Sequence, residues 1–210
     1  MSHKFSALTF TDDVADVQRE MGSRPANEML TERGPANDTL GPDERFFIAA
    51  RDGFYLATVG ATGWPYLQFR GGPTGFLDIR DHHTLAYADV TGNRQYITTG
   101  NLRSNHHAAL FFMDYPNQTR LKLLADIETI PWSDAPEWKS ELKLPEKARP
   151  ERVVLIHVAA FDWNCPQHIP QRWTIEELRQ TPIFTRIEAL EKENRDLRAA
   201  LAKAKPAAKP

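Results

Sequence analysis

The chain has 210 residues, a formal net charge of −2 at pH 7, 41% hydrophobic residues and 26% charged residues, which is the balance of a globular protein. This charge disfavours a general nucleic-acid binder, which needs a basic excess, and the single cysteine, Cys165, excludes an internal disulfide. No apolar run approaches the ~20 residues of a membrane span, and the first residues lack the apolar core of a signal peptide. We therefore expect a cytoplasmic protein with neither a nucleic-acid partner nor a membrane partner.

Residues 1–41 are expected to form an N-terminal helix and an extended arm. Thr11 can cap a short helix that ends at Arg19, because two aspartates follow it and negative charges are favourable in a first helical turn. The segment Met21–Leu40 is rich in Gly, Pro and Asn, a composition that indicates an extended loop.

Residues 42–172 are expected to form the main domain, with one helix followed by an antiparallel β-barrel. Pro42 and the two acidic residues after it mark the first turn of the helix. Short runs of aromatic and β-branched residues then predict strands, and the absence of long alternating helices favours a barrel over a doubly wound sheet. The expected strands are Phe54–Val59, Trp64–Arg70, Phe76–Ile79, Thr84–Ala88, two more between Gly100 and Ile130, and Arg152–Phe161. A helix from Ala135 to Leu142 is expected before the last of them.

Residues 173–204 are expected to form a C-terminal helical element, and residues 205–210 a disordered tail. Thr174 and Glu177 have the spacing of a capping box at the start of a helical turn. Apolar residues and one asparagine then recur at alternating spacings of four and three, which is the seam of a coiled coil. The seam consists of Ile183, Ile187, Leu190, Asn194, Leu197 and Leu201.

This heptad pattern predicts that the chain forms a homodimer through a parallel coiled coil, in addition to any contact between barrels. Asn194 lies at an a position, where a polar residue favours a parallel two-stranded register. Oppositely charged residues flank the seam where two chains would meet: Arg186 with Glu191, and Glu193 with Arg198. The alternative is a single amphipathic helix folded onto its own domain, because the pattern covers few heptads.

The stretch Ala86–Ile130 has the features of an anion site. The run Gly92–Gln95 leads into a short helix that ends near Gly100, so that backbone amides and a helix N-terminus face one spot. Arg120 and Lys122 lie two residues apart on an expected strand and therefore project from the same face.

Arg70 adds a further cation to this site from an earlier strand. It precedes Gly71 and Gly72, where the missing side chains allow a ligand to approach the backbone closely. Cations from three separate segments suggest a single anion, and a flavin phosphate is our first hypothesis for it. The alternative is that each arginine is simply solvated at the surface.

Three segments carry a resemblance to a known family. In order along the chain, FYLATVGATGWPYLQFRGG, TLAYADVTGNRQYITTGNLRSNHHAALFFMDY and RLKLLADIETI resemble the FMN-binding split-barrel group and, within it, the proteins related to pyridoxamine 5′-phosphate oxidase. The resemblance runs from Pro42 to Ile130 and, more loosely, to Arg172. It implies a six-stranded antiparallel split barrel that forms a homodimer and holds FMN in a groove between the subunits.

The same resemblance implies a set of flavin ligands. The cation that ends the second strand, the loop after the fourth strand and the later basic strand would hold the phosphate. The residues just before Arg70 would lie along the ring or the ribityl chain, and a tryptophan and an arginine would come from the other subunit. The implied ligands are Leu67, Gln68, Phe69, Arg70, Gly71, Asn93, Arg94, Gln95, Arg120, Lys122, Trp163 and Arg172.

The C-terminal part departs from the family pattern, because a heptad helix stands where the oxidases have a basic, histidine-containing segment for the substrate phosphate. We therefore expect an FMN-binding flavoprotein that acts as an oxidoreductase on a small molecule, with the vitamin B6 substrate in doubt. The alternatives are a non-catalytic flavin- or haem-binding protein, a deazaflavin-dependent reductase of the same fold, and a scaffold in which the helix is the working part.

No catalytic constellation stands out in the sequence, and none is required where a flavin performs the redox chemistry. His168, three residues after Cys165, is a weak candidate for proton relay, and the thiol is expected to be structural or incidental. The pairs His82-His83 and His106-His107 have no neighbouring set of Cys or carboxylate ligands, so no metal site is expected.

Overall fold

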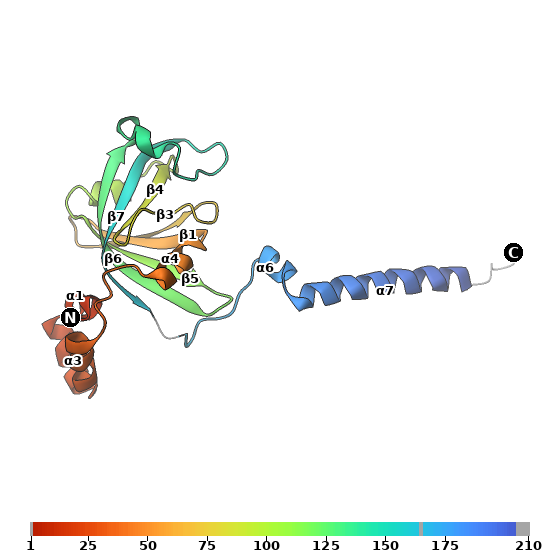
Figure 1. Ribbon diagram of the computed structural model, residues 1–210, viewed down its shortest axis with the longest axis horizontal. Helices are drawn as coiled ribbons and strands as arrows, with labels where there is room; N and C mark the ends of the chain where they lie inside the picture. Colours follow the sequence, from red (N-terminus) through yellow and green to blue (C-terminus); the bar gives the residue numbers. More distant parts are fainter. Residues whose placement is uncertain (1, 164–165, 205–210) are drawn as a thin grey trace. The chain divides into compact units, whose positions relative to one another are not determined.

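The computed structural model describes residues 2–163 and 166–204 of the chain (Figure 1). Cys165 and the expected disordered tail 205–210 lie outside these residues. The chain divides into two compact units, which are described separately: Met1–Asp114 with Gln118–His168, and Tyr115–Asn117 with Ile169–Pro210.

The first unit is mainly β-structure, with one antiparallel sheet and flanking helices, as the sequence predicts. In the described residues the sheet has seven strands in the order β2-β1-β5-β6-β7-β4-β3. Their bounds are β1 Gly53–Val59, β2 Pro65–Gly71, β3 Asp78–Ile79, β4 Thr84–Val90, β5 His107–Asp114, β6 Thr119–Pro131 and β7 Pro150–Trp163.

The six-stranded split barrel that the family resemblance implies is corrected here, whereas the residue patterns themselves predict seven strands. The sheet has a seventh strand, the two-residue β3, and its hydrogen-bonded order ends at β2 on one side and at β3 on the other, so the ring is not closed. The predicted strand Phe76–Ile79 is shortened because Phe76 and Leu77 pack into the core, and only the residues after them pair with β4. The edge at β3 has only two residues, which limits the unpaired backbone that this side of the open sheet exposes, whereas the edge at β2 has seven.

Alternation along the strands builds the core on one face of the sheet. Phe54 and Leu56 of β1 are buried, as are Leu110 and Phe112 of β5, whereas the residues between them face outward. The rings of Phe54 and Phe112 lie 5.3 Å apart at their centroids. We call the opposite side, which carries Tyr55 with the outward residues of β2, β5 and β6, the outer face.

Four helices precede the sheet: α1 Lys4–Thr9, α2 Asp12–Glu20, α3 Arg24–Arg33 and α4 Pro42–Ala49. The predicted cap of α2 is confirmed, because the Thr11 side chain accepts a hydrogen bond from the backbone N–H of Val14 at 3.4 Å. The expectation of an extended loop from Met21 to Leu40 is wrong, since α3 lies within it. Its proline falls in the first turn, where the missing N–H does no harm, and Gly34 follows its end.

The remaining helices are α5 Ile97–Asn101, α6 Ile175–Arg179 and α7 Pro182–Ala204. The helix expected from Ala135 to Leu142 is wrong: two short 3₁₀ turns, Trp132–Asp134 and Pro136–Trp138, take its place. The capping box of α6 is confirmed, with the backbone N–H of Glu177 donating to Thr174 Oγ1 at 3.2 Å. None of the described helices is both long enough and apolar enough to cross a membrane.

Candidate functional site

The edge strand β2 presents different side chains on its two faces. Tyr66, Gln68 and Arg70 are half-buried and point toward the loop that follows β4. Leu67 and Phe69 project from the outer face and are 62% and 58% exposed. One strand therefore offers a polar surface on one side and an apolar surface on the other.

The loop after β4, Thr91–Tyr96, is held in an unusual backbone conformation. Arg94 has φ 61° and Tyr96 has φ 54°, both in the left-handed region that non-glycine residues rarely adopt. The Asn93 side chain accepts a hydrogen bond from the backbone N–H of Gln95 at 3.1 Å, which stabilises the turn. A Cβ added at Gly92 would meet no atom within 4 Å, so the loop leaves open space beside its backbone.

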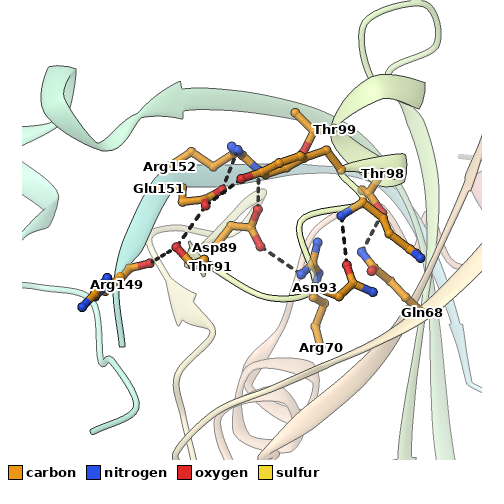
Figure 2. A network of polar contacts seen from close by, with 12 residues as sticks. Gln68, Arg70, Asp89, Thr91, Asn93, Thr98, Thr99, Arg149, Glu151 and Arg152 are labelled. Carbon is orange, nitrogen blue, oxygen red and sulfur yellow. Dashed lines mark hydrogen bonds and ion pairs between the residues drawn. The ribbon is translucent and has the colours of Figure 1, made fainter. Parts of the chain in front are cut away.

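A buried carboxylate links two arginines beneath this loop (Figure 2). Asp89 of β4 is 6% exposed, and its Oδ1 lies 2.9 Å from Arg70 Nη1 while its Oδ2 lies 2.7 Å from Arg152 Nη1. The same Arg152 nitrogen donates to Thr99 Oγ1 at 2.8 Å. Asp89 thus joins β2, β4, β7 and α5 through paired, hydrogen-bonded charges, the arrangement in which buried charges persist.

Gln68 engages Arg70 from the other side. In the amide orientation that satisfies its neighbours, the Gln68 oxygen accepts from Arg70 Nη2 at 2.6 Å and from Nε at 3.1 Å, and from the Thr98 hydroxyl at 2.6 Å. The Arg70 guanidinium is therefore committed to Gln68 and to Asp89, and Figure 2 draws the second of these contacts. Arg70 therefore stabilises the site through these contacts and has little hydrogen-bonding capacity left for a ligand.

Glu151 anchors the loop from β7. It accepts hydrogen bonds from Thr91 Oγ1 and from the Tyr96 hydroxyl, each at 3.0 Å, and it lies 3.0 Å from Arg152 Nη2. Partial burial alone would raise the pKa of Glu151, but these hydrogen bonds and the positive charges of Arg152 and Arg94 together hold the pKa below its usual value. The ionised carboxylate is thus the form that fixes the loop.

This pKa shift predicts a pH-dependent contribution to stability. We expect Glu151→Gln to lower the free energy of unfolding by about 1 kcal/mol at pH 7, because the ion pair with Arg152 is lost. A carboxylate with a lowered folded pKa stabilises the protein above its unfolded pKa of about 4.3 and loses that effect as the pH falls through the folded pKa. The difference between wild type and Glu151→Gln, measured by urea unfolding from pH 7 to pH 3, should therefore shrink toward zero. Glu146→Gln, an exposed control, should show no such trend.

Arg94 is the cation that this arrangement leaves available. It is exposed, and in the part of the chain that the structure describes it makes no hydrogen bond or ion pair, its charge reaching Glu151 only at longer range. The pocket around it encloses about 400 Å³ of empty space, part of it open solvent. Its lining contains three guanidinium groups and two carboxylates, so one positive charge is in excess: Arg70, Arg94 and Arg152 against Asp89 and Glu151.

The structure brings together five of the residues that the sequence predicts as flavin ligands. Gln68, Arg70, Asn93, Arg94 and Gln95 all line this pocket. Two more of the predicted ligands, Leu67 and Phe69, lie on the same strand as Gln68 and Arg70, but their side chains are on the outer face and point away from the pocket.

The basic residues of β6 lie elsewhere in the chain. Lys122 Nζ lies 2.8 Å from Asp162 Oδ2 and 4.7 Å from the centre of the Phe5 ring, on the outer face. Arg120 has a buried Nε without a hydrogen-bond partner in the described residues. Within one chain, therefore, the structure does not bring the two basic residues of β6 to the pocket that contains Arg94.

The C-terminal candidates make contacts of their own. Trp163 Nε1 donates to Glu44 Oε1 at 2.6 Å and packs edge-on against Phe47. Arg172 stacks over the ring of Tyr115 within the second unit, at 5.1 Å from its centre. His168 has φ 65°, and no described contact gives it a catalytic role.

Sequence reasoning missed the support of the site. Asp89, Glu151 and Arg152 were not singled out, nor were Thr98 and Thr99 of α5, although all of them line the pocket. One signal was present: Asp89 is a charged residue inside the apolar run of β4, and a buried charge requires a partner. Among the described residues, no group of three His, Cys, Asp or Glu is arranged to hold a metal ion.

Comparisons with known proteins bear on residues 40–164. Over this range, which is more than half of the chain, the sequence matches the family model described as pyridoxamine 5′-phosphate oxidase. A search of curated proteins finds no match.

Solved structures match parts of the chain at low sequence identity. A candidate pyridoxamine 5′-phosphate oxidase from Lactobacillus delbrueckii is 24% identical, over 60% of this chain and 94% of that one, with a TM-score of 0.47. HupZ from Group A Streptococcus is 16% identical, over 64% of this chain and 100% of that one, with a TM-score of 0.45. An F420 reductase is 18% identical, over 56% of this chain and 94% of that one, with a TM-score of 0.39.

Proposed function

The chain belongs to the pyridoxamine 5′-phosphate oxidase family, and on that premise we propose that it binds FMN and acts as an oxidoreductase on a small molecule. The observation that carries the proposal is the loop Thr91–Tyr96, where Arg94, a cation with no ion pair to any described residue, lies beside open backbone in a preformed, left-handed turn. Strained backbone of this kind persists where the surrounding structure fixes it, as the contacts of Glu151 do here.

The charges of the pocket suit a phosphate group. Asp89 compensates Arg70 and Arg152, so that the two buried guanidinium groups do not repel each other. Arg94 remains as the charged donor, and Asn93 and the loop amides add neutral donors. We propose that these groups hold the flavin phosphate by charge-assisted hydrogen bonds.

The apolar side of β2 suits the flavin ring. Leu67 and Phe69 are exposed on the outer face, and Tyr55 packs against Phe69 with ring centres 5.4 Å apart. Because β2 is an edge strand, a ligand held in the pocket can extend around it to the outer face. We propose that these side chains orient the ring there, while FMN, when bound, supplies the electron and hydride transfer. The substrate would then meet the ring at the outer face.

A second copy of the chain completes this proposal. Exposed apolar side chains on the outer face would be covered by the outer face of a second copy, as large exposed apolar surface usually is in an assembly. Arg120, Lys122 and Trp163 do not reach the pocket of their own chain, so any role that they have toward the flavin would be exerted across this dimer.

A non-catalytic flavin-binding protein is the second candidate. The titratable side chains of the pocket favour it: Asp89 and Glu151 are both committed to arginines, and neither is poised to donate or accept a proton from a substrate. In that case the pocket would bind flavin, but no electron donor would reduce it on the time scale of turnover.

The experiment that tests the proposal is reconstitution. The purified chain is incubated separately with FMN, deazaflavin cofactor F420 and haem, desalted, and examined by absorbance. We expect retention of FMN at one per chain, and reduction of the bound flavin by a nicotinamide donor. Retention of FMN without reduction by any donor would favour the non-catalytic candidate, whereas retention of deazaflavin or haem in its place would contradict the FMN assignment.

A further inference from the structure

The helix α7 carries an apolar stripe that no described residue of its own unit covers. It runs without interruption for 23 residues, from Pro182 to Ala204 (Figure 1). The apolar side chains of this stripe are between 45% and 63% exposed, and they are Ile183, Ile187, Leu190, Leu197 and Leu201. Exposed apolar residues occur singly on many surfaces, but a continuous stripe along a helix marks an interaction face.

The spacing of the stripe specifies a coiled-coil partner. Successive seam positions alternate between four and three residues, which keeps the seam on one side of the helix over about three heptads. Ile187, Leu190 and Asn194 line one hollow on the helix surface, and the charged residues Glu191 and Arg198 border it. Asn194 therefore lies on the same side of the helix as its apolar seam neighbours, where it would face the partner helix of a two-helix interface.

The flanking charges point to a second copy of the same helix. In a parallel, in-register pair, a g residue of one helix faces the e residue five positions later on the other. The two charged pairs that flank the seam are both of opposite sign: Arg186 with Glu191, and Glu193 with Arg198. A helix that is complementary to itself in this way needs no other protein to satisfy its charges.

We propose that α7 forms a parallel, in-register, two-stranded coiled coil with α7 of a second copy of this chain. Asn194 fixes the orientation, because in the parallel pair its amide meets the amide of the second Asn194 and the two can hydrogen-bond. An antiparallel pair would place each amide against a leucine and leave it unsatisfied in an apolar seam.

This pairing has a consequence for the first unit that does not depend on the flavin. Two chains joined at α7 hold their sheets at an effective concentration in the millimolar range for a short connection. A weak contact between outer faces would then be populated at low protein concentration. The helix would stabilise the dimer by keeping the two chains together, without contacting any ligand.

Disulfide trapping in the full-length chain tests the proposal. Leu190→Cys is made in a Cys165→Ser background and oxidised mildly at micromolar concentration. Leu190 lies at d and would face its own counterpart, within the range of Cα separations that a disulfide can span. We expect most of the protein to become covalent dimer, and addition of Leu197→Glu to reduce that yield at least fivefold.

Lys192→Cys in the same background is the matched control. It lies on the same helix two residues away, at f, and points away from the seam. We expect little cross-linking there. Equal yields at the two positions, or no dimer from Leu190→Cys, would overturn the proposal. In a helix folded onto its own chain, and in an antiparallel pair, Leu190 does not face its own counterpart, so Leu190→Cys has no advantage in cross-linking over the control.

Discussion

Asp89→Ala is expected to lower the free energy of unfolding by about 3 kcal/mol, since it removes a carboxylate that is shared by two largely buried arginines. The side chains of Arg70 and Arg152 are only 23% and 16% exposed, so water compensates their charges poorly once Asp89 is gone. The partial exposure keeps the expected loss at the lower end of the range for broken buried pairs. Urea unfolding followed by tryptophan fluorescence, in a buffer without phosphate, measures this change.

Asp126→Ala provides the matched control for this prediction. Asp126 Oδ1 also lies 2.7 Å from a basic side chain, at Nδ1 of His107, but the Asp126 side chain is 54% exposed. Exposed pairs contribute little, so we expect a loss of at most about 0.5 kcal/mol. Equal losses from the two substitutions would show that Asp89 does not hold the site together.

Arg94→Ala is expected to weaken FMN binding by about 1.5–3 kcal/mol, or roughly tenfold to 150-fold, through the loss of a charge-assisted contact with the phosphate. Arg94 makes no hydrogen bond or ion pair with the described residues, so the substitution leaves no partner unsatisfied in the free protein. Stability in the absence of flavin should therefore change little. Isothermal titration calorimetry with FMN measures the affinity, and urea unfolding checks the stability.

Two controls separate a phosphate contact from a general effect of charge. Arg103→Ala removes an exposed arginine that does not line the pocket, and it should leave FMN affinity within about twofold of wild type. Riboflavin has no phosphate, so its affinity should be the same for wild type and Arg94→Ala. Unchanged FMN affinity in Arg94→Ala would remove this arginine from the site.

Local patterns in the sequence predicted most elements of the fold. Short runs of aromatic and β-branched residues placed β1, β4 and β7 within a few residues of their ends, and Thr11 placed the start of α2. The prediction failed for α3, because it relied on the amino-acid composition of the segment and ignored where in the segment each residue lies. The glycines, prolines and asparagines around α3 suggested a loop, although its proline lies in the first turn, where a helix tolerates it.

The closure of the sheet and the support of the site could not be predicted for a different reason. Whether β2 and β3 pair depends on the three-dimensional path of the whole sheet, which no local pattern records. Asp89 and Arg152 are 63 residues apart, and no local sequence pattern around either residue indicates that the two form an ion pair. The loop with Arg94 was recognisable because a glycine, a polar turn residue and a cation occur together in four consecutive positions.

The most direct test of the central claim is a fluorescence titration of the wild-type chain into FMN and, in parallel, into riboflavin at low ionic strength. If the loop Thr91–Tyr96 holds the flavin phosphate, FMN fluorescence will change saturably, and FMN will bind at least about tenfold more tightly than riboflavin. A failure of FMN to bind, or equal affinities for the two flavins, would contradict the assignment of a phosphate site to this loop.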